Sequence, residues 1–126
     1  MPLNRKLSDY ILLAAFIAGL ICMFMPSGQS ADELRTTKAL WNLGHPVLFF
    51  VAGHLAYAFY PGLAGRSPSQ QVLLLFLSVL AAAGATELAQ GLIPGRFPSY
   101  TDILGDLAGI AAYLSFRFRK KARQYA

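Results

Sequence analysis

The stretch ELAQGLIPGRFPSYTDILGD, residues 87–106, joins two apolar segments and holds three of the six acidic residues of the chain. Glu87 lies near the end of one segment, and Asp102 and Asp106 lie at the start of the next. An ionised group at membrane depth costs about 2.5–3.5 kcal/mol on insertion scales, so several together require pairing, protonation or a wet cavity. The Pro-Gly step at residues 94–95 cannot continue a helix cheaply. The stretch therefore predicts a hairpin between two helices, and it is the expected functional site.

The composition indicates one small membrane domain rather than a soluble protein. Of the 126 residues, 56% are hydrophobic and 13% are charged, which is too apolar for a solvated surface of mixed charge. The chain is also too short for two ordinary domains, so a single domain over residues 1–126 is expected. Its one cysteine, Cys22, excludes an internal disulfide.

Four apolar segments predict four transmembrane helices. A hydrocarbon core about 30 Å thick requires roughly 20 helical residues, and links rich in Pro, Gly and Ser separate the segments. The predicted fold class is therefore all-α, a polytopic membrane protein with a compact bundle of helices over residues 7–25, 40–60, 71–92 and 100–118. A cleavable secretory signal is the alternative for the first segment, but its removal would place the two basic ends on opposite sides.

The basic residues set the predicted orientation. Arg5 and Lys6 precede the first segment, and five more basic residues lie between positions 117 and 123. Because lysine and arginine near the ends of membrane segments favour the cytoplasm, both termini are expected there, with the first and third loops outside. The formal net charge of +5 is concentrated at these ends, which fits anionic lipid headgroups better than nucleic acid.

The candidate ligand site combines polar groups from three predicted helices and one loop: His45, Glu87, Gln90, Arg96, Asp102 and Asp106. Glu87 and Gln90 are spaced i,i+3, and Asp102 and Asp106 are spaced i,i+4, so each pair shares a helix face. The helical rise of 1.5 Å per residue places Glu87 and Asp106 at matching depths near the outer face. The alternative is a purely structural ion pair in which Arg96 locks the two helices together.

The two histidines are expected to differ in role. His45 precedes Pro46, which disfavours helical geometry and places the imidazole at a kink or at the start of a helix on the outer side. His54 comes nine residues later, so it points about 180° away and lies some 13 Å deeper. We expect His54 to serve packing or bonding between helices.

No metal ion and no cofactor are expected from the spacing of the residues. Imidazole and carboxylate groups suit zinc, manganese or iron, but the polar residues lack a specific ligand spacing such as His-Glu-x-x-His. The sequence also lacks a phosphate loop, a nucleotide-binding glycine fingerprint and a nucleophile elbow. Gly105 and Gly109 form a small-xxx-small pattern that predicts close helix packing, with the edge formed by Ala81, Ala85 and Ala89 as its expected counterpart.

A specific order of residues runs through most of the chain: His45, Glu87-x-x-Gln90, Arg96 after Pro-Gly, Ser99-x-x-Asp102 and Gly109. In this order the chain resembles the VanZ-like family of small bacterial membrane proteins. Asn42 and Asp106 depart from the family pattern, which has lysine and asparagine at those places. The resemblance implies a four-helix protein of the bacterial inner membrane, in a family named for low-level resistance to the glycopeptide teicoplanin. It implies no reaction.

These observations favour a non-enzymatic inner-membrane protein whose outward polar pocket binds an amphipathic molecule. The expected partners are membrane lipids, and a lipid-linked cell-wall precursor or a glycopeptide is a further candidate ligand. Nucleic acid is not expected, and a homo-oligomer stays open. One alternative is a membrane enzyme that acts on a lipid phosphate or ester by acid/base or metal-assisted chemistry, with Glu87 or His45 as base. Another is a subunit of a proton-coupled transporter.

Overall fold

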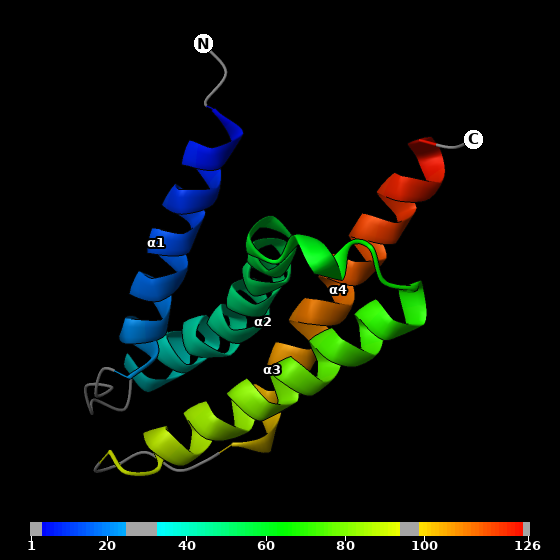
Figure 1. Cartoon of the computed structure of the whole chain (residues 1–126). Helices are drawn as coiled ribbons and strands as arrows, with labels where there is room; N and C mark the ends of the chain where they lie inside the picture. The colour runs from blue at the N-terminus through cyan, green and yellow to red at the C-terminus, as the bar shows by residue number, and fades with distance from the viewer. Residues whose placement is uncertain (1–3, 25–32, 94–98, 125–126) are drawn as a thin grey trace.

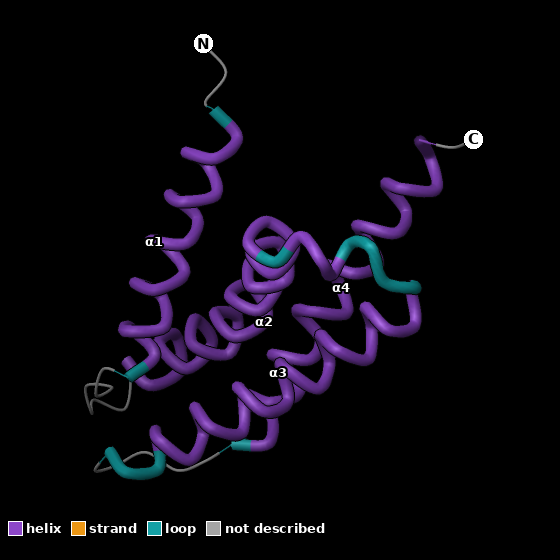
Figure 2. Tube along the Cα trace, in the orientation of Figure 1, coloured by secondary structure: helices purple, strands orange, loops and turns teal. Residues whose placement is uncertain are grey.

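The computed structural model describes residues 4–24, 33–93 and 99–124, with side chains of the second helix described from residue 42 onward. This part of the chain is all-α, as predicted. It contains four long helices, α1 (Arg5–Met23), α2 (Glu33–Phe59), α3 (Pro68–Gln90) and α4 (Tyr100–Gln124), and a short 3-10 helix, η1 (Pro61–Leu63). Figure 2 shows that helix dominates the described trace.

Two helices extend well beyond their predicted bounds, whereas α1 and α3 differ from theirs by at most three residues at either end. Helix α2 begins at Glu33 instead of residue 40, and α4 continues to Gln124 instead of ending at residue 118. The extensions contain mainly residues with high helix propensity, such as Leu, Arg, Lys, Ala and Gln. The apolar segments therefore predicted the location of each helix, but they underestimated the length of α2 and α4, whose ends are polar.

The helices alternate in direction (Figure 1). The Arg5 end of α1 and the Gln124 end of α4 lie on the same side of the molecule, and the end of α3 and the start of α4 lie on the opposite side. Helix α2 packs most extensively against α4 and also contacts α1, whereas α3 packs against α4. Helices α2 and α4 therefore form the centre of the structure.

The core lies mainly where α2, α3 and α4 meet. Its buried apolar side chains form one cluster, made of Phe49, Leu63, Leu75, Val79, Ile110, Tyr113 and Leu114. By contrast, Met23 is the buried residue that α1 contributes. Helix α1 is therefore held at the edge of the structure by few buried contacts.

Gly109 brings α4 close to the backbone of α2. A Cβ built on Gly109 would overlap with the carbonyl of Pro46, and one built on Gly105 would lie 3.3 Å from the Cβ of His45. The prediction that these glycines serve helix packing is thus supported by their surroundings, but the expected counterpart is wrong. Ala81, Ala85 and Ala89 are exposed on α3, because α4 turns its glycine face to α2 instead.

The start of α3 is fixed by a capping box. The Ser67 hydroxyl accepts from the Gln70 backbone N–H at 3.4 Å, and the Gln70 side chain accepts from the Ser67 N–H at 3.2 Å. Pro68 occupies the first helical position, where its missing N–H costs nothing. The cap sets where α3 begins and so helps to fix the position of its polar end at Glu87.

Two helices of the described chain are long and apolar enough to cross a membrane: Arg5–Met23 and Pro68–Gln90. Helices α2 and α4 are also longer than 20 residues. Their polar extensions and their buried polar residues lower their mean hydropathy.

Candidate functional site

His45 lies inside α2 and not at the start of a helix, which was one of the two positions that the sequence predicted. Helix α2 runs from Glu33 to Phe59 and includes Pro46. A proline within a helix removes a single backbone donor, here the one that would reach the Asn42 carbonyl. The helix accommodates this loss, and its close contact with Gly109 of α4 lies at the same point. His45 is consequently held on a packed helix and not on a free end.

The His45 imidazole forms a buried pair with Asp106 of α4. Nδ1 of His45 lies 2.8 Å from Oδ1 of Asp106, and the Asp106 side chain is 0% exposed. With Asp106 ionised, its carboxylate can only accept, so Nδ1 of His45 is then the donor. In a neutral imidazole with that hydrogen on Nδ1, the lone pair is on Nε2, and the contact with Asp106 orients the ring.

Two further acids approach the same imidazole. Nε2 of His45 lies 3.6 Å from Oδ2 of Asp102, which is longer than a hydrogen bond. One ligand atom from each of His45, Glu87 and Asp102 lies within 4.8 Å of the other two. The side chains of His45, Glu87, Asp102 and Asp106, here called the His45 cluster, therefore converge from α2, α3 and α4 as the sequence predicted.

Glu87 connects the end of α3 to the start of α4. Its Oε2 accepts from the backbone N–H of Ser99 at 2.6 Å, and Ser99 in turn accepts from the Asp102 N–H at the first turn of α4 at 3.2 Å. The Ser99 contact could not be predicted from the sequence, because its donor is a backbone N–H, which every residue except proline has. This bond holds the Glu87 carboxylate in one place beside α4.

Within the part of the chain that the structure describes, two oxygens of the His45 cluster are buried without a hydrogen-bond partner, Oε1 of Glu87 and Oδ2 of Asp106. Buried carboxylate oxygens are normally satisfied by donors, cations or water. Within the described residues, no lysine or arginine lies within 4.0 Å of these acids. Among the described residues, the cluster is therefore rich in acceptors and has no neighbouring lysine or arginine.

Of the remaining two predicted site residues, Gln90 contacts a different helix and Arg96 is not among the described residues. Gln90 is buried, but its amide donates to the backbone carbonyl of Met23 at 3.1 Å, which ties the end of α3 to the end of α1. Gln90 follows Glu87 by about one turn of α3, but its side chain reaches α1 instead of α4. Arg96 lies in the segment 94–98, outside the described residues, as does its predicted ion pair.

A cavity opens beside the His45 cluster between α3 and α4. It has a volume of about 290 Å³ and is lined by Gly84, Glu87, Leu88, Ser99, Tyr100 and Ile103. Most of these side chains are apolar or small, and Glu87 is the charged one among them. Because Glu87 belongs to both the cavity and the cluster, a molecule in the cavity reaches the cluster through this carboxylate.

A second polar region lies nearer the Arg5 end of α1. His54 of α2 bonds to Asp9 of α1, with Nε2 and Oδ1 3.0 Å apart, which agrees with the prediction of bonding between helices. On the same side of the molecule, the guanidinium of Arg117 lies 3.5 Å from the ring centre of Tyr57, and Tyr57 donates to Gln71 at 2.6 Å. Sequence reasoning missed these contacts, since none of the three residues belongs to a motif.

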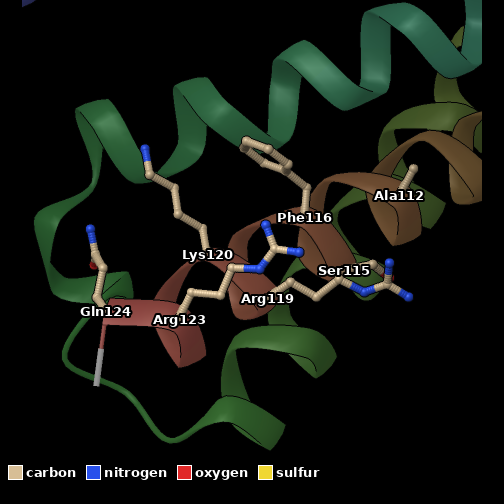
Figure 3. Close-up of a pocket in the computed structure, with 7 residues that line it drawn as sticks. All are labelled: Ala112, Ser115, Phe116, Arg119, Lys120, Arg123 and Gln124. Atoms are coloured by element: carbon tan, nitrogen blue, oxygen red, sulfur yellow. The ribbon is translucent and has the colours of Figure 1, made fainter. Parts of the chain in front are cut away.

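The C-terminal part of α4 carries a basic pocket of about 620 Å³ (Figure 3). Arg119, Lys120 and Arg123 extend around it, and Phe116 lies toward its apolar end. Such a mixture of aromatic and basic side chains is typical of a helix that leaves a membrane among anionic headgroups. We interpret this pocket as an anchoring surface, distinct from the His45 cluster.

Comparison of the chain with models of protein families, with curated proteins and with solved structures finds no match.

Proposed function

We propose that this protein is a multi-pass protein of the bacterial inner membrane in which all four long helices cross the bilayer. Both termini would be cytoplasmic, and the His45 cluster would lie toward the outer face. Two apolar helices and the shared side of the Arg5 and Gln124 ends support this arrangement. The resemblance to the VanZ-like family supports the same topology.

The exposed apolar side chains are the strongest support for membrane insertion. Leu73, Leu77 and Leu88 of α3 are all more than half exposed, as are Ile11 and Ile21 of α1. Soluble monomers rarely expose apolar patches beyond a few hundred Å². A bilayer covers such helices, and it leaves the buried polar residues as the feature that requires a separate explanation.

In this setting the His45 cluster is proposed to bind the polar headgroup of an amphipathic molecule, without chemical conversion. The observation that carries the proposal is the position of Glu87, which is buried in the cluster and also lines the largely apolar cavity. A lipid headgroup or a lipid-linked envelope intermediate combines a polar part for the cluster with an apolar part for the cavity. The VanZ-like resemblance adds amphipathic glycopeptides to the candidate ligands.

The cluster presents acceptors, so it complements a headgroup that carries hydrogen-bond donors. Phosphatidylethanolamine has such donors on its ammonium group, whereas phosphatidylcholine carries none there. The test uses the full chain in nanodiscs with equal amounts of these two lipids and native mass spectrometry in the presence of a chelator. We expect preferential retention of phosphatidylethanolamine, and a loss of that preference in Glu87→Gln.

Asp9→Asn is the matched control, because it removes a carboxylate that also pairs with a histidine but lies outside the His45 cluster. It should retain the preference. Equal retention of the two lipids by the unmodified protein, or an unchanged preference in Glu87→Gln, would contradict the proposed site. Teicoplanin, added in place of the lipid mixture, tests the glycopeptide arm with the same variants.

A further inference from the structure

The acceptor atoms of the His45 cluster lie close enough together to bind a cation between them. When His45 is neutral and donates Nδ1–H to Asp106, its Nε2 lone pair faces Oδ2 of Asp102 at 3.6 Å. Two acceptors at this distance repel each other unless a positive group lies between them. The Glu87 carboxylate stands at the same place, within 4.8 Å of both, and adds a further negative charge.

Burial makes this charge imbalance costly. Glu87 is 3% exposed, and its Oε1 has no hydrogen-bond partner among the residues that the structure describes. Three carboxylates surround one imidazole, so even a protonated His45 would neutralise only one of them. Buried charges in proteins are paired or coordinate metals. Among the described residues, no lysine or arginine is close enough to supply the missing charge.

The distances fit a metal ion. Ligand atoms about 2.1 Å from a tetrahedral zinc ion lie about 3.4 Å from one another, and Nε2 of His45 and Oδ2 of Asp102 are 3.6 Å apart. The 4.8 Å limit that includes Glu87 exceeds this tetrahedral spacing by up to about 1.4 Å, which the Glu87 side chain would have to close.

Asp106 supplies an independent sign of a metal site. A histidine that binds a metal through one ring nitrogen almost always donates its other N–H to a carboxylate, a backbone carbonyl or water. The 2.8 Å contact between Nδ1 of His45 and Oδ1 of Asp106 is such an arrangement, and it points Nε2 toward Asp102 and Glu87. Asp106 is therefore a positioning residue rather than a ligand.

We propose that one divalent transition-metal ion, most suitably zinc, is bound by Nε2 of His45 and by the carboxylates of Glu87 and Asp102. Asp106 orients His45 for this role. One nitrogen and two oxygen ligands suit zinc, and three protein ligands leave a fourth position open. The inference rests on the proposed function in using the same pocket: Glu87 and Asp102 would hold the ion, so zinc and an ammonium headgroup would compete for these carboxylates. Residue spacing alone did not indicate the ion, because its ligands come from three helices.

The test measures metal content and affinity in the full chain purified in detergent. The protein is stripped with a chelator, loaded with Zn²⁺ and dialysed, and bound zinc is counted by plasma mass spectrometry. Co²⁺ loading adds a visible absorption spectrum that reports four-coordinate geometry. We expect one zinc ion per chain and an intense cobalt spectrum of the tetrahedral type.

The variants separate ligands from the positioning residue. Asp106→Asn should weaken zinc affinity by about 10- to 100-fold while keeping the cobalt spectrum, because it removes only the outer support. Glu87→Gln and Asp102→Asn should weaken affinity at least as strongly and should change the cobalt spectrum, because each alters a metal bond. His54→Gln, at the other histidine that pairs with an aspartate, should bind zinc like the unmodified protein.

Two outcomes would overturn the metal site: no stoichiometric zinc in a helical, monodisperse preparation, or equal zinc binding by the unmodified protein and by Glu87→Gln and Asp102→Asn. The lipid experiment, run with chelator, separates this inference from the proposed function. If the protein failed to bind zinc in the loading test but still preferred phosphatidylethanolamine in the lipid test, only the metal site would be disproved. Stoichiometric zinc without any lipid preference would remove the headgroup site and leave the metal site standing.

Discussion

The protein contains two histidine–aspartate pairs with nearly the same bond length and different surroundings. His45 and Asp106 are 2.8 Å apart with side chains 5% and 0% exposed, whereas His54 and Asp9 are 3.0 Å apart with side chains 38% and 16% exposed. The first pair joins the central helices α2 and α4, and the second joins α2 to the edge helix α1. Bond length therefore does not distinguish them, but burial does.

The neighbours of each pair extend this difference. His45 faces two more carboxylates, those of Asp102 and Glu87, while His54 lies in a cavity lined by several basic residues, Arg5, Arg117, Lys120 and Lys121. The pair of His54 and Asp9 is partly exposed and lies near basic side chains, so it should contribute little to stability. A buried pair with excess negative charge requires compensation. The comparison supports the proposal of ligand chemistry at the His45 cluster and favours structural bonding for the pair of His54 and Asp9.

The largest expected effect is that of His45→Ala in metal-free protein. Removing the imidazole leaves Asp106 buried without a partner, which should lower the free energy of unfolding by about 3–5 kcal/mol. The measurement is reversible unfolding in mixed detergent micelles, followed by circular dichroism. The double variant His45→Ala/Asp106→Asn should recover part of the loss because it removes the buried charge. A cost no greater than that of His54→Ala would contradict the distinction between the pairs.

An intermediate effect is expected from Gly109→Ala, which tests the packing that brings His45 to Asp106. The added methyl group overlaps with the Pro46 carbonyl, and backbone cannot move aside as a flexible side chain would. Overpacking should lower the free energy of unfolding by about 1–3 kcal/mol. Gly44→Ala is the matched control, since a Cβ there has nothing within 4 Å. If the two substitutions behaved alike, α2 and α4 would not approach closely at this point.

The smallest effect is expected from His54→Ala. Because the pair is partly exposed, the same unfolding measurement should show a change of at most about 1 kcal/mol. Added salt should reduce even this contribution. A loss as large as that of His45→Ala would show that α1 is held by His54 and Asp9 much more strongly than its few buried contacts indicate.

The sequence predicted part of this comparison correctly. The all-α class and the location of each helix follow from apolar length and turn-forming links, which are local properties. The grouping of His45, Glu87, Asp102 and Asp106 followed from matching depths along alternating helices. Helix ends were less predictable, since α2 and α4 continue into polar residues that still favour helix.

Other features depended on which helix faces which. Gln90 shares a helix face with Glu87, yet it bonds to the backbone of Met23 on α1. The alanine edge of α3 was expected to receive Gly105 and Gly109, but these glycines contact His45 and Pro46 of α2. Periodicity identifies a face of small residues without identifying its partner, because many pairings satisfy the same pattern.

By itself, the sequence determined where the helices form and which polar residues had to be explained, because helix propensity, apolar length and turn residues act over short stretches of chain. Tertiary structure decided the roles: Asp106 orients His45, Glu87 and Asp102 face Nε2, and Gln90 turns to α1. Those roles depend on distances of a few ångströms between helices. Such distances are set by how glycine and proline let the backbones approach, and no local pattern encodes them.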